Sequence, residues 1–430
     1  MKTGNTSSQK PATAFSWLVM YFGLAYFCQH FAQTGLIGQP LSFYFKEVLG
    51  FGPKAVTEFM AILTIPWMIK PLYGLISDYI PLFGYRRKSY LLLLNLAATA
   101  GFIALTGMTG PSSIRFALLL TAFSTAASDV LVDGLMVELG NKTGMTKRFQ
   151  SQQWLWFNAA SVITALGGGY FAQHFAPATG LHLAALVTAA FPLVMVASTW
   201  FCVKEEKSKV DLAELKVTTS SLLSALKSRT LWIVMGFLAF WQFSPSFGTP
   251  MYYHQVDNLK FSQDFIGQLG AIGSIASVIG AWLYKRFLAD RYTTRQLLYA
   301  SVAIGTAGTL AYLLMIDPTT TATPLTAIIL GAVFGVAGVV AFLTTLNLAA
   351  EACPKRVEAL TFAVLMSVFN LAGQGSALFG AYLYEDVFHS HLSPLIWVSA
   401  AFTFACFFLV PMLPKLDTEK DAGNGENKAE

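Results

Sequence analysis

Three charged residues lie within stretches of the sequence that are otherwise almost wholly apolar. Lys70 stands in the run WMIKPLYGLISD, and Asp129 and Asp133 stand four residues apart in SDVLVDG. An ionisable side chain in hydrocarbon costs about 3 kcal/mol or more, so it needs a partner or a ligand there. Two carboxylates at i and i+4 share a helix face and must be solvated, paired with a cation or partly protonated. The chemistry that fits is binding of a charged solute or movement of protons.

Lys70 has two interpretations. Its Cα lies eight residues before Asp78, about 12 Å along a helix axis, which is long for a side chain that snorkels to the membrane surface. Pro66 and Pro71 bracket it, and prolines free backbone carbonyls and bend helices. We therefore favour a cavity-facing lysine, which meets an anionic substrate or an acidic partner, over a lysine at the interface.

The sequence leaves two interpretations of Asp129 and Asp133 open. One is a proton-coupling or substrate-amine site, and the other is a structural ion pair with Lys70 or Arg148. The two are compatible. Glu138 lies five residues beyond Asp133, about 140° round the helix, so we expect it at the membrane interface and not in the pair.

Asn347 and Glu351 repeat the four-residue spacing in a later apolar run. Glu351 is a third candidate for proton coupling, but it stands near the predicted cytoplasmic end of its helix, just before Lys355 and Arg356. An ion pair with either cation explains it equally well. Asn347 is deeper, and we expect it to line a cavity.

Uncharged polar side chains stand at helical spacing in several other apolar runs. They are Gln29 and Gln33, Trp154 and Asn158, Trp241 and Gln242, and Ser367, Asn370 and Gln374. Each alone is explained by interhelical hydrogen bonding, worth about 0.6 kcal/mol per bond. Together, with aromatic residues beside them, they suit a planar substrate with hydrogen-bonding edges. The predicted substrate site is Gln33, Lys70, Asp129, Asp133, Trp154, Asn158, Gln242, Asn347, Asn370 and Gln374.

Twelve apolar runs, each of about the 20 residues that cross a ~30 Å hydrocarbon core, carry these side chains. They are 15–38, 55–78, 88–108, 113–138, 149–174, 180–202, 230–253, 264–288, 296–316, 324–350, 357–384 and 392–413. Charged residues make up 12% of the chain, against roughly 25% in soluble proteins. A membrane β-barrel would show alternating segments of about 10 residues. The predicted fold class is all-α integral membrane, with twelve transmembrane helices.

The basic residues indicate how these helices are oriented. With the N-terminus in the cytoplasm, Lys46, Lys54, Arg115 and Lys260 fall in external segments and Lys70 within a span. The rest of the 28 basic residues fall in cytoplasmic segments, which is the positive-inside distribution. An even number of helices places both termini in the cytoplasm.

The longest polar stretch between spans divides the chain into two six-helix halves. The predicted parts are a tail at 1–14, a bundle at 15–203, a cytoplasmic linker at 204–229, a second bundle at 230–414 and a tail at 415–430. The i, i+4 polar pairs of the fourth and tenth spans echo one another, although chance similarity between apolar helices is an alternative. Parallel repeats of this kind are typical of the major facilitator architecture, with substrate near the midplane between the halves.

Other functional classes find no support in the sequence. The four cysteines, Cys28, Cys202, Cys353 and Cys406, show no paired spacing of a metal site or a disulfide framework. The sequence contains no Walker A motif and no Ser–His–Asp pattern, so we expect neither an ATP-driven pump nor an enzyme. We expect no cofactor, no metal and no nucleic-acid partner.

The second span with its following loop, and the fourth span, resemble the folate–biopterin transporter family of the major facilitator superfamily. The family pattern falls on Trp67, Lys70, Pro71, Gly74, Ser77, Asp78, Gly84, Tyr85, Arg86 and Arg87, and in the fourth span on Ser128, Asp129, Asp133 and Glu138. These specific motifs lie in the N-terminal half, and the C-terminal half matches mainly by helix layout.

The loop also resembles the general superfamily motif between the second and third helices, with extra residues inserted between Asp78 and Gly84. The resemblance implies a charge latch at the cytoplasmic gate, in which an acidic residue pairs across helices and basic residues contact neighbouring helix ends. The implied gate residues are Gly74, Asp78, Gly84, Arg86, Arg87 and Arg148.

The resemblance implies a monomeric secondary transporter of folates and related pterins that works by alternating access. Its expected location is the inner (plasma) membrane of a bacterium or a plastid-type envelope. Lys70 would meet the glutamate tail of a folate, and Asp129 or Asp133 the pterin edge. Proton symport is a hypothesis motivated by the membrane carboxylates. The alternative is a major facilitator exporter of another organic anion or a drug.

Overall fold

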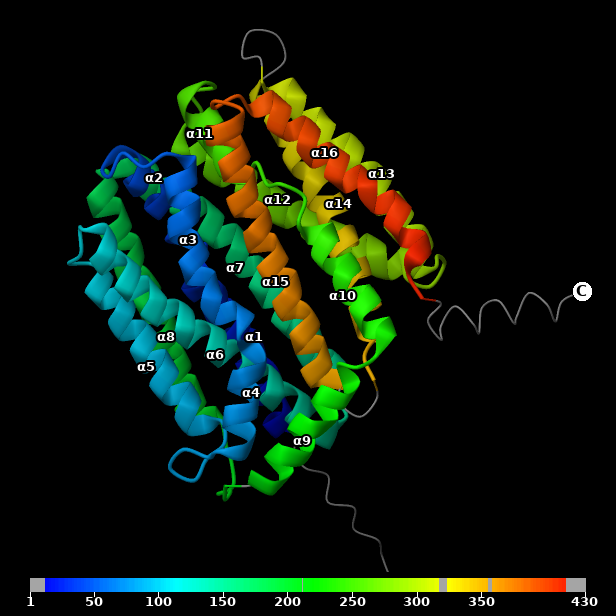
Figure 1. The fold of residues 1–430 in the computed structure, drawn as a ribbon. Coiled ribbons are helices and arrows are strands. Elements are labelled where there is room, and N and C mark those ends of the chain that lie inside the picture. The colour runs from blue at the N-terminus through cyan, green and yellow to red at the C-terminus, as the bar shows by residue number, and fades with distance from the viewer. Residues whose placement is uncertain (1–11, 211, 317–322, 355–357, 415–430) are drawn as a thin grey trace, which may run out of the picture.

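The computed structural model describes residues 12–210, 212–316, 323–354 and 358–414, and nearly all of them are helical (Figure 1). The helices are α1 (Ala12–His30), α2 (Gly38–Glu47), α3 (Pro53–Met68), α4 (Lys70–Tyr79), α5 (Lys88–Leu105), α6 (Pro111–Thr143), α7 (Thr146–His174), α8 (Pro177–Cys202), α9 (Leu212–Ala225), α10 (Arg229–Gln242), α11 (Gly248–Asp257), α12 (Gln263–Leu283), α13 (Thr294–Ala311), α14 (Pro324–Glu351), α15 (Glu358–Tyr382) and α16 (Leu392–Leu409). Short π-helical turns follow α1, α12 and α15 at Phe31–Gly35, Tyr284–Leu288 and Leu383–Val387.

The membrane-spanning character that the sequence predicts is confirmed, but the count of twelve is not confirmed in full. Within the described residues, nine helices are long and apolar enough to cross a membrane, or ten if the bent pair α9–α10 is one span. The predicted spans 15–38, 149–174 and 230–253 are not among the nine. The last of them is divided into α10 and α11 where the Ser244-Pro245-Ser246 segment ends the helix.

The second predicted span is also interrupted, at the position of Lys70. Helix α3 ends and α4 begins on either side of Ile69, whose backbone is not helical. Pro66 and Pro71 lie on the two sides of this break. The hydroxyl group of Tyr73 donates a hydrogen bond of 3.0 Å to the carbonyl of Pro66. The break therefore leaves that carbonyl satisfied and places Lys70 at the first position of a new helix.

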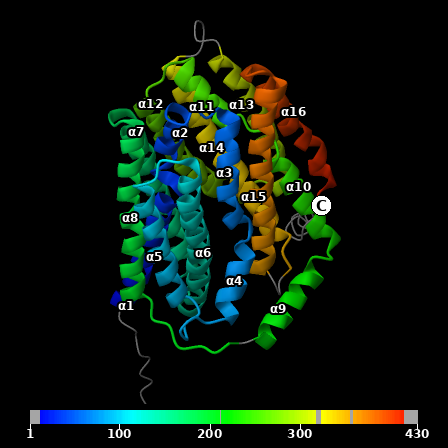
Figure 2. The same cartoon turned by 60° about the vertical axis from the view of Figure 1, so that its left-hand side comes forward.

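Helices α1–α8 form one bundle and α10–α16 the other (Figure 2). The bundles meet where α7 packs against α12 and α3 against α15. The first contact is close because both helices carry glycine: a Cβ at Gly267 would lie 2.6 Å from the carbonyl oxygen of Ala165 and 3.0 Å from the Cα of Gly169. Each bundle has its own buried apolar core.

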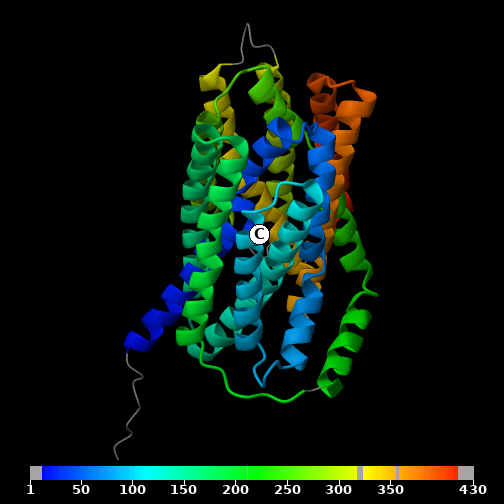
Figure 3. The same ribbon diagram turned by 90° about the vertical axis from the view of Figure 1, so that its left-hand side faces the viewer.

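The predicted linker 204–229 contains a helix of its own. After α8 the chain runs beneath the first bundle in an extended segment and then forms α9, which is bent by 77° from α10 (Figure 3). Helix α9 contacts α4 of the first bundle and α15 of the second. The linker thus touches both halves at the end that the sequence predicts to be cytoplasmic.

Candidate functional site

Lys70 and Asp129 form an ion pair inside the first bundle. The Nζ atom of Lys70 lies 2.6 Å from the Oδ2 atom of Asp129 and 4.6 Å from the centroid of the Trp67 ring. The side chain of Asp129 is 7% exposed and that of Lys70 is 23% exposed. Lys70 therefore meets an acidic partner within the bundle and keeps part of its surface open.

The two carboxylates of α6 also bind side chains from α1. The amide of Gln29 donates to the second oxygen of Asp129, and the hydroxyl group of Tyr26 donates to Asp133. The buried side chain of Gln153, on α7, lies against Asp133 as well. One cation, two carboxylates, two amides and a phenol thus form a continuous polar cluster between α1, α4, α6 and α7.

Sequence reasoning did not assign Tyr26 or Gln153 to the site. The signal for Tyr26 was its spacing, because it stands three residues before Gln29 and seven before Gln33 on one helix face. Gln153 directly precedes Trp154 and lies on another face of α7, so nothing in the pattern separated it from ordinary interhelical amides.

Aromatic rings continue the cluster on one side. The ring of Phe157 lies 6.3 Å from that of Tyr26, 4.5 Å from His30 and 5.8 Å from Trp154 between centroids. Trp154 is 45% exposed. An exposed indole beside the polar cluster offers a flat apolar surface to a ligand ring.

The remaining predicted residues of the first bundle, Asn158 and Gln33, lie outside the polar cluster. Asn158 donates a 2.7 Å hydrogen bond to the backbone of Trp154, one turn earlier on α7. Gln33 is half-buried in the π-helical turn Phe31–Gly35, a type of irregularity that is frequent at functional sites.

Predicted residues of the second bundle fall into two groups. Gln374 accepts a 2.8 Å hydrogen bond from Thr64 of α3, which joins the halves six residues before Lys70. Gln242 packs against Gly373 of α15: a Cβ added to Gly373 would lie 3.0 Å from the amide nitrogen of Gln242. Asn370 is half-buried and lies on the same helix as Gln374.

The second group lies elsewhere in the same bundle. Asn347 donates a 2.6 Å hydrogen bond to the hydroxyl group of Tyr284, and Glu351 lies 3.4 Å from Thr294 at the exposed end of α14. The predicted alternative partners of Glu351, Lys355 and Arg356, lie outside the described residues.

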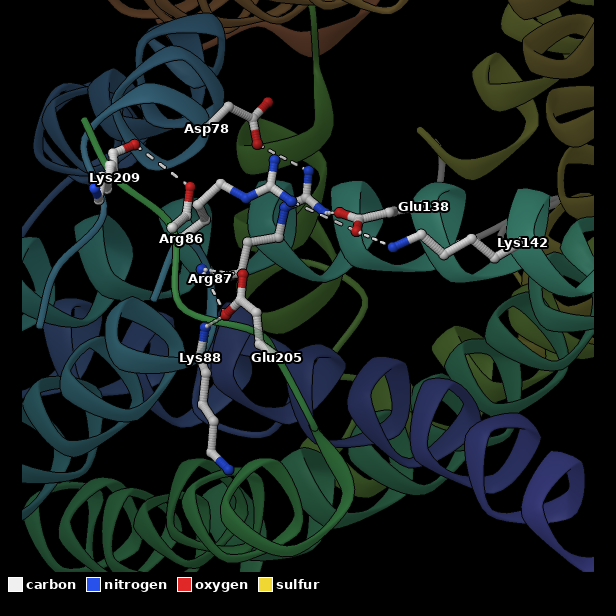
Figure 4. A network of polar contacts seen from close by, with 9 residues as sticks. Asp78, Arg86, Arg87, Lys88, Glu138, Lys142, Glu205 and Lys209 are labelled. Atoms are coloured by element: carbon white, nitrogen blue, oxygen red, sulfur yellow. Dashed lines mark hydrogen bonds and ion pairs between the residues drawn. The ribbon is translucent and has the colours of Figure 1, made fainter. Parts of the chain in front are cut away.

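Three of the implied gate residues, Asp78, Arg86 and Arg87, form an ionic network with Glu138 at the other end of α4 and α6 (Figure 4). The guanidinium of Arg87 lies 2.6 Å from Glu138 and 2.8 Å from Asp78, and its side chain is 9% exposed. Arg86 approaches Glu138 at 3.6 Å, and Lys142 at 2.7 Å. Glu138 is therefore the acceptor that ties the loop before α5 to α6.

Glycine residues leave space for the side chains and the loop of this network. A Cβ at Gly134 would lie 3.2 Å from the guanidinium of Arg87, and Gly84 has a positive φ of 85° that favours glycine. Gly74 faces Val130 of α6 at 3.6 Å. Arg148 is exposed near the start of α7, and the network does not include it.

Within the described part of the chain, two ion pairs and one histidine–aspartate hydrogen bond join charged or ionisable side chains of the two bundles, all at the opposite end. They are Lys46–Asp257 and Lys54–Asp386, each at 2.7 Å, and His174–Asp264 at 2.8 Å. Lys46, Lys54, Asp257 and Asp386 fall in segments that the sequence predicts to be external, and His174 and Asp264 are the external end residues of the predicted spans 149–174 and 264–288. In the described ranges, no group of three His, Cys, Asp or Glu side chains is arranged to hold a metal ion.

Comparison with known proteins identifies this architecture. The profile of the BT1 family matches residues 32–429. A folate-biopterin transporter of Synechocystis sp. is 33% identical over 370 residues, which cover 83% of this chain and 73% of the relative. A probable folate-biopterin transporter 4 of Arabidopsis thaliana is 24% identical over 435 residues, covering 86% and 88%.

A solved structure of the POT family transporter PepTSo superposes with a TM-score of 0.73 at 14% identity, covering 92% of this chain and 97% of that one. The predicted major facilitator fold is thereby confirmed. The relatives also confirm the prediction of a transporter rather than an enzyme. The chain is a multi-pass membrane transport protein and belongs to the BT1 family, and it is similar to a protein named folate-biopterin transporter and to one named probable folate-biopterin transporter 4.

Proposed function

We propose that this chain carries folates and related pterins across a membrane by alternating access between its two halves. The observation that carries the proposal is the Lys70–Asp129 pair, a partly open cation beside the Trp67 ring. Lys70 lies on the helix pair α3–α4, which contacts the second bundle through the hydrogen bond between Thr64 and Gln374. The names of the relatives agree with this substrate class.

The cluster contains both kinds of group that the ends of a folate bind, a cation and carboxylates with amides. Its glutamate tail carries two carboxylates, which need a cation, and its pterin ring has amine and lactam edges, which carboxylates and amides read. We assign the tail to Lys70, a pterin edge to Asp129 or Asp133, and the ring face to Trp154. The other proposed contacts are Gln33, Asn158, Gln242, Asn347, Asn370 and Gln374.

Two features support alternating access. The Lys46–Asp257 and Lys54–Asp386 ion pairs and the His174–Asp264 hydrogen bond lie at the end predicted to be external, and the Arg87 network at the other end joins elements of the first bundle. Closure at one end of a site between two halves is what an inward-facing state requires. The positive-inside distribution supports cytoplasmic termini, in a bacterial plasma membrane or a plastid-type envelope. We infer that the monomer is the working unit.

Vesicle uptake of labelled folate tests the proposal directly. We expect saturable uptake that unlabelled folate and a pterin both compete away, and direct binding of folate to purified protein that weakens in Asp133→Asn. The alternative, an exporter of another organic anion or a drug, predicts that folate neither binds nor competes. Absence of folate binding to stable, purified protein would therefore overturn the substrate assignment.

Proton coupling by Asp129, Asp133 or Glu351 has its own test. We expect a protonophore to reduce folate accumulation in vesicles to the level of the external concentration, because symport needs the proton gradient to concentrate the solute. Exchange of labelled against unlabelled folate should continue under the same conditions. Accumulation that persists without the gradient would remove the proton from the proposal and leave the carrier function intact.

A further inference from the structure

The linker that follows α8 is bonded to the loop that precedes α5. The carboxylate of Glu205 accepts hydrogen bonds from the backbone N–H of Arg87, at 3.1 and 3.2 Å to its two oxygens, and from that of Lys88 at 2.9 Å. Arg87 is the N-cap of α5, and no side chain within α5 caps it. Glu205 therefore satisfies N–H groups that the helix leaves free, and its negative charge suits a helix N-terminus.

The contact is reciprocal. The ammonium group of Lys88 donates to the carbonyls of Trp200, at 3.0 Å, and Val203, at 2.8 Å, which end α8. A positive charge suits the C-terminus of a helix, where carbonyls lack partners. A third bond runs from the backbone N–H of Ser208 to the carbonyl of Gly84, at 2.9 Å. The start of the linker and the gate loop are thus held together along their length.

The same residue carries both this contact and the gate network. The backbone of Arg87 is held by Glu205, while its guanidinium is held by Glu138 and Asp78 (Figure 4). The position of the Arg87 backbone decides where its guanidinium can reach. Glu205 therefore influences the geometry of the ionic network, although its carboxylate binds backbone N–H groups and none of the charged side chains of the network. Glu205 lies outside the family pattern of the second and fourth spans.

The linker continues from this point to the second bundle. The hydroxyl groups of Tyr79, at the end of α4, and Thr218, on α9, lie 2.8 Å apart. Helix α9 also contacts α15, and only residues 226–228 separate it from α10. A displacement of α10 relative to the first bundle therefore acts on a segment that is anchored at Glu205.

We propose that Glu205 is a positioning residue of the gate, through which the linker between the halves controls the Arg87 network. This inference rests on alternating access but not on the identity of the substrate. While Glu205 holds the two N–H groups, Arg87 stays within reach of Glu138. When movement of the second bundle withdraws the linker, the loop is released and the ionic network opens.

Glu205→Ala tests the proposal against Glu206→Ala, a matched control at an exposed neighbour. We expect Glu205→Ala to lower the maximal rate of folate uptake about tenfold while KM changes by less than about twofold, because a step of the cycle is altered and not the binding site. Glu206→Ala should behave as the unmodified protein. Equal rates in the two variants would overturn the proposal.

A double-variant cycle separates positioning from mere stabilisation. If Glu205 acts through the gate, Glu205→Ala combined with Glu138→Gln should transport no more slowly than Glu138→Gln alone. Additive losses would show that Glu205 acts independently of the network and would refute the inference.

A readout without substrate keeps the inference apart from the folate assignment. Spin labels at Gln150→Cys on α7 and Lys285→Cys after α12 report the separation of the halves at the predicted cytoplasmic end. Glu205→Ala should change the distribution of that distance, and Glu206→Ala should not. Unchanged distances in Glu205→Ala would contradict the inference even if folate were the wrong substrate.

Discussion

Lys70→Met is expected to abolish saturable folate uptake and to destabilise the protein. The variant leaves the carboxylate of Asp129 without its cation in a site where that side chain is 7% exposed. Removal of one partner of a buried ion pair typically costs about 3–5 kcal/mol. Loss of uptake from this variant alone would therefore not distinguish a ligand-binding lysine from a structural one.

The double variant Lys70→Met/Asp129→Asn makes that distinction. It removes both charges, and replacement of a buried ion pair by neutral groups is often without net cost, so the thermal midpoint should return close to that of the unmodified protein. The affinity for folate should stay low by about 10- to 150-fold, since a charge-assisted hydrogen bond contributes about 1.5–3 kcal/mol. Calorimetric folate binding and thermal unfolding of the purified variants measure the two effects separately.

The pterin end supplies an internal control. If the pterin edge binds Asp133, a pterin without the glutamate tail should lose far less affinity for the double variant than folate does, because Lys70 is assigned to the tail. Equal losses for the two ligands would place the pterin edge on Asp129. Lys216→Met, at an exposed position of α9, should leave both affinities unchanged. If the double variant is stable and binds folate normally, Lys70 is a structural residue and the tail is held elsewhere.

The Lys70 site shows what the sequence could predict and why. A lysine eight residues from the helix end between two prolines could not remain on a regular, lipid-facing helix, and two aspartates on one face needed a cation. The structure joins these statements into one contact, Lys70–Asp129. Tyr26 and Gln153 could not be assigned in the same way, because an uncharged polar residue in a helix has many equally good uses.

Glu138 shows where helical geometry alone misleads. Its angular position on α6, far from Asp133, agrees with its absence from the cluster of Asp129 and Asp133. Its contacts with Arg86 and Arg87, however, depend on a loop from another part of the chain. The course of that loop, with its residues inserted before Gly84, follows no periodic pattern. Glu205 contacts the same loop, so no pattern in the sequence distinguishes it from the other charged residues of the linker.

The number of membrane-spanning helices could not be predicted fully from hydropathy for a similar reason. Hydropathy finds apolar length, but it does not find the interruption at Ser244-Pro245-Ser246 that divides the predicted span 230–253. Nor does hydropathy decide whether a helix with several amides crosses the membrane: α7, the predicted span 149–174, is not among the nine helices of the described residues that are long and apolar enough. In both cases polar side chains contact other helices of the same bundle: Ser244 lies 3.1 Å from Ser399 and 3.2 Å from Thr403 of α16, and Gln153 of α7 lies against Asp133 of α6.

Gly267→Val is expected to shift the protein away from the conformation seen here and to slow transport strongly. Even a Cβ at this position would lie 2.6 Å from a backbone oxygen of α7, which cannot move aside as a flexible side chain could. Overpacking of a tight contact costs about 1–3 kcal/mol, which shifts an equilibrium by roughly 5- to 150-fold. The contact between α7 and α12 lies at the predicted external end of the molecule, where the ion pairs Lys46–Asp257 and Lys54–Asp386 also lie. The two halves should therefore separate at that end.

Distances at both ends of the molecule test this expectation. Spin labels at Thr179→Cys and Asn258→Cys, at the predicted external end, should move apart in Gly267→Val, and labels at Gln150→Cys and Lys285→Cys should approach one another. The opposite changes at the two ends follow because alternating access closes one side as it opens the other.

The control for this prediction is Gly236→Val on α10. An added Cβ there would meet nothing within 4 Å, so the variant places the same β-branched residue in a helix without touching a neighbour. It should transport and report distances as the unmodified protein does. If Gly267→Val behaved like this control, close packing of α7 on α12 would not be part of the transport cycle. If it widened both ends together, the two bundles would move independently and alternating access would be the wrong mechanism.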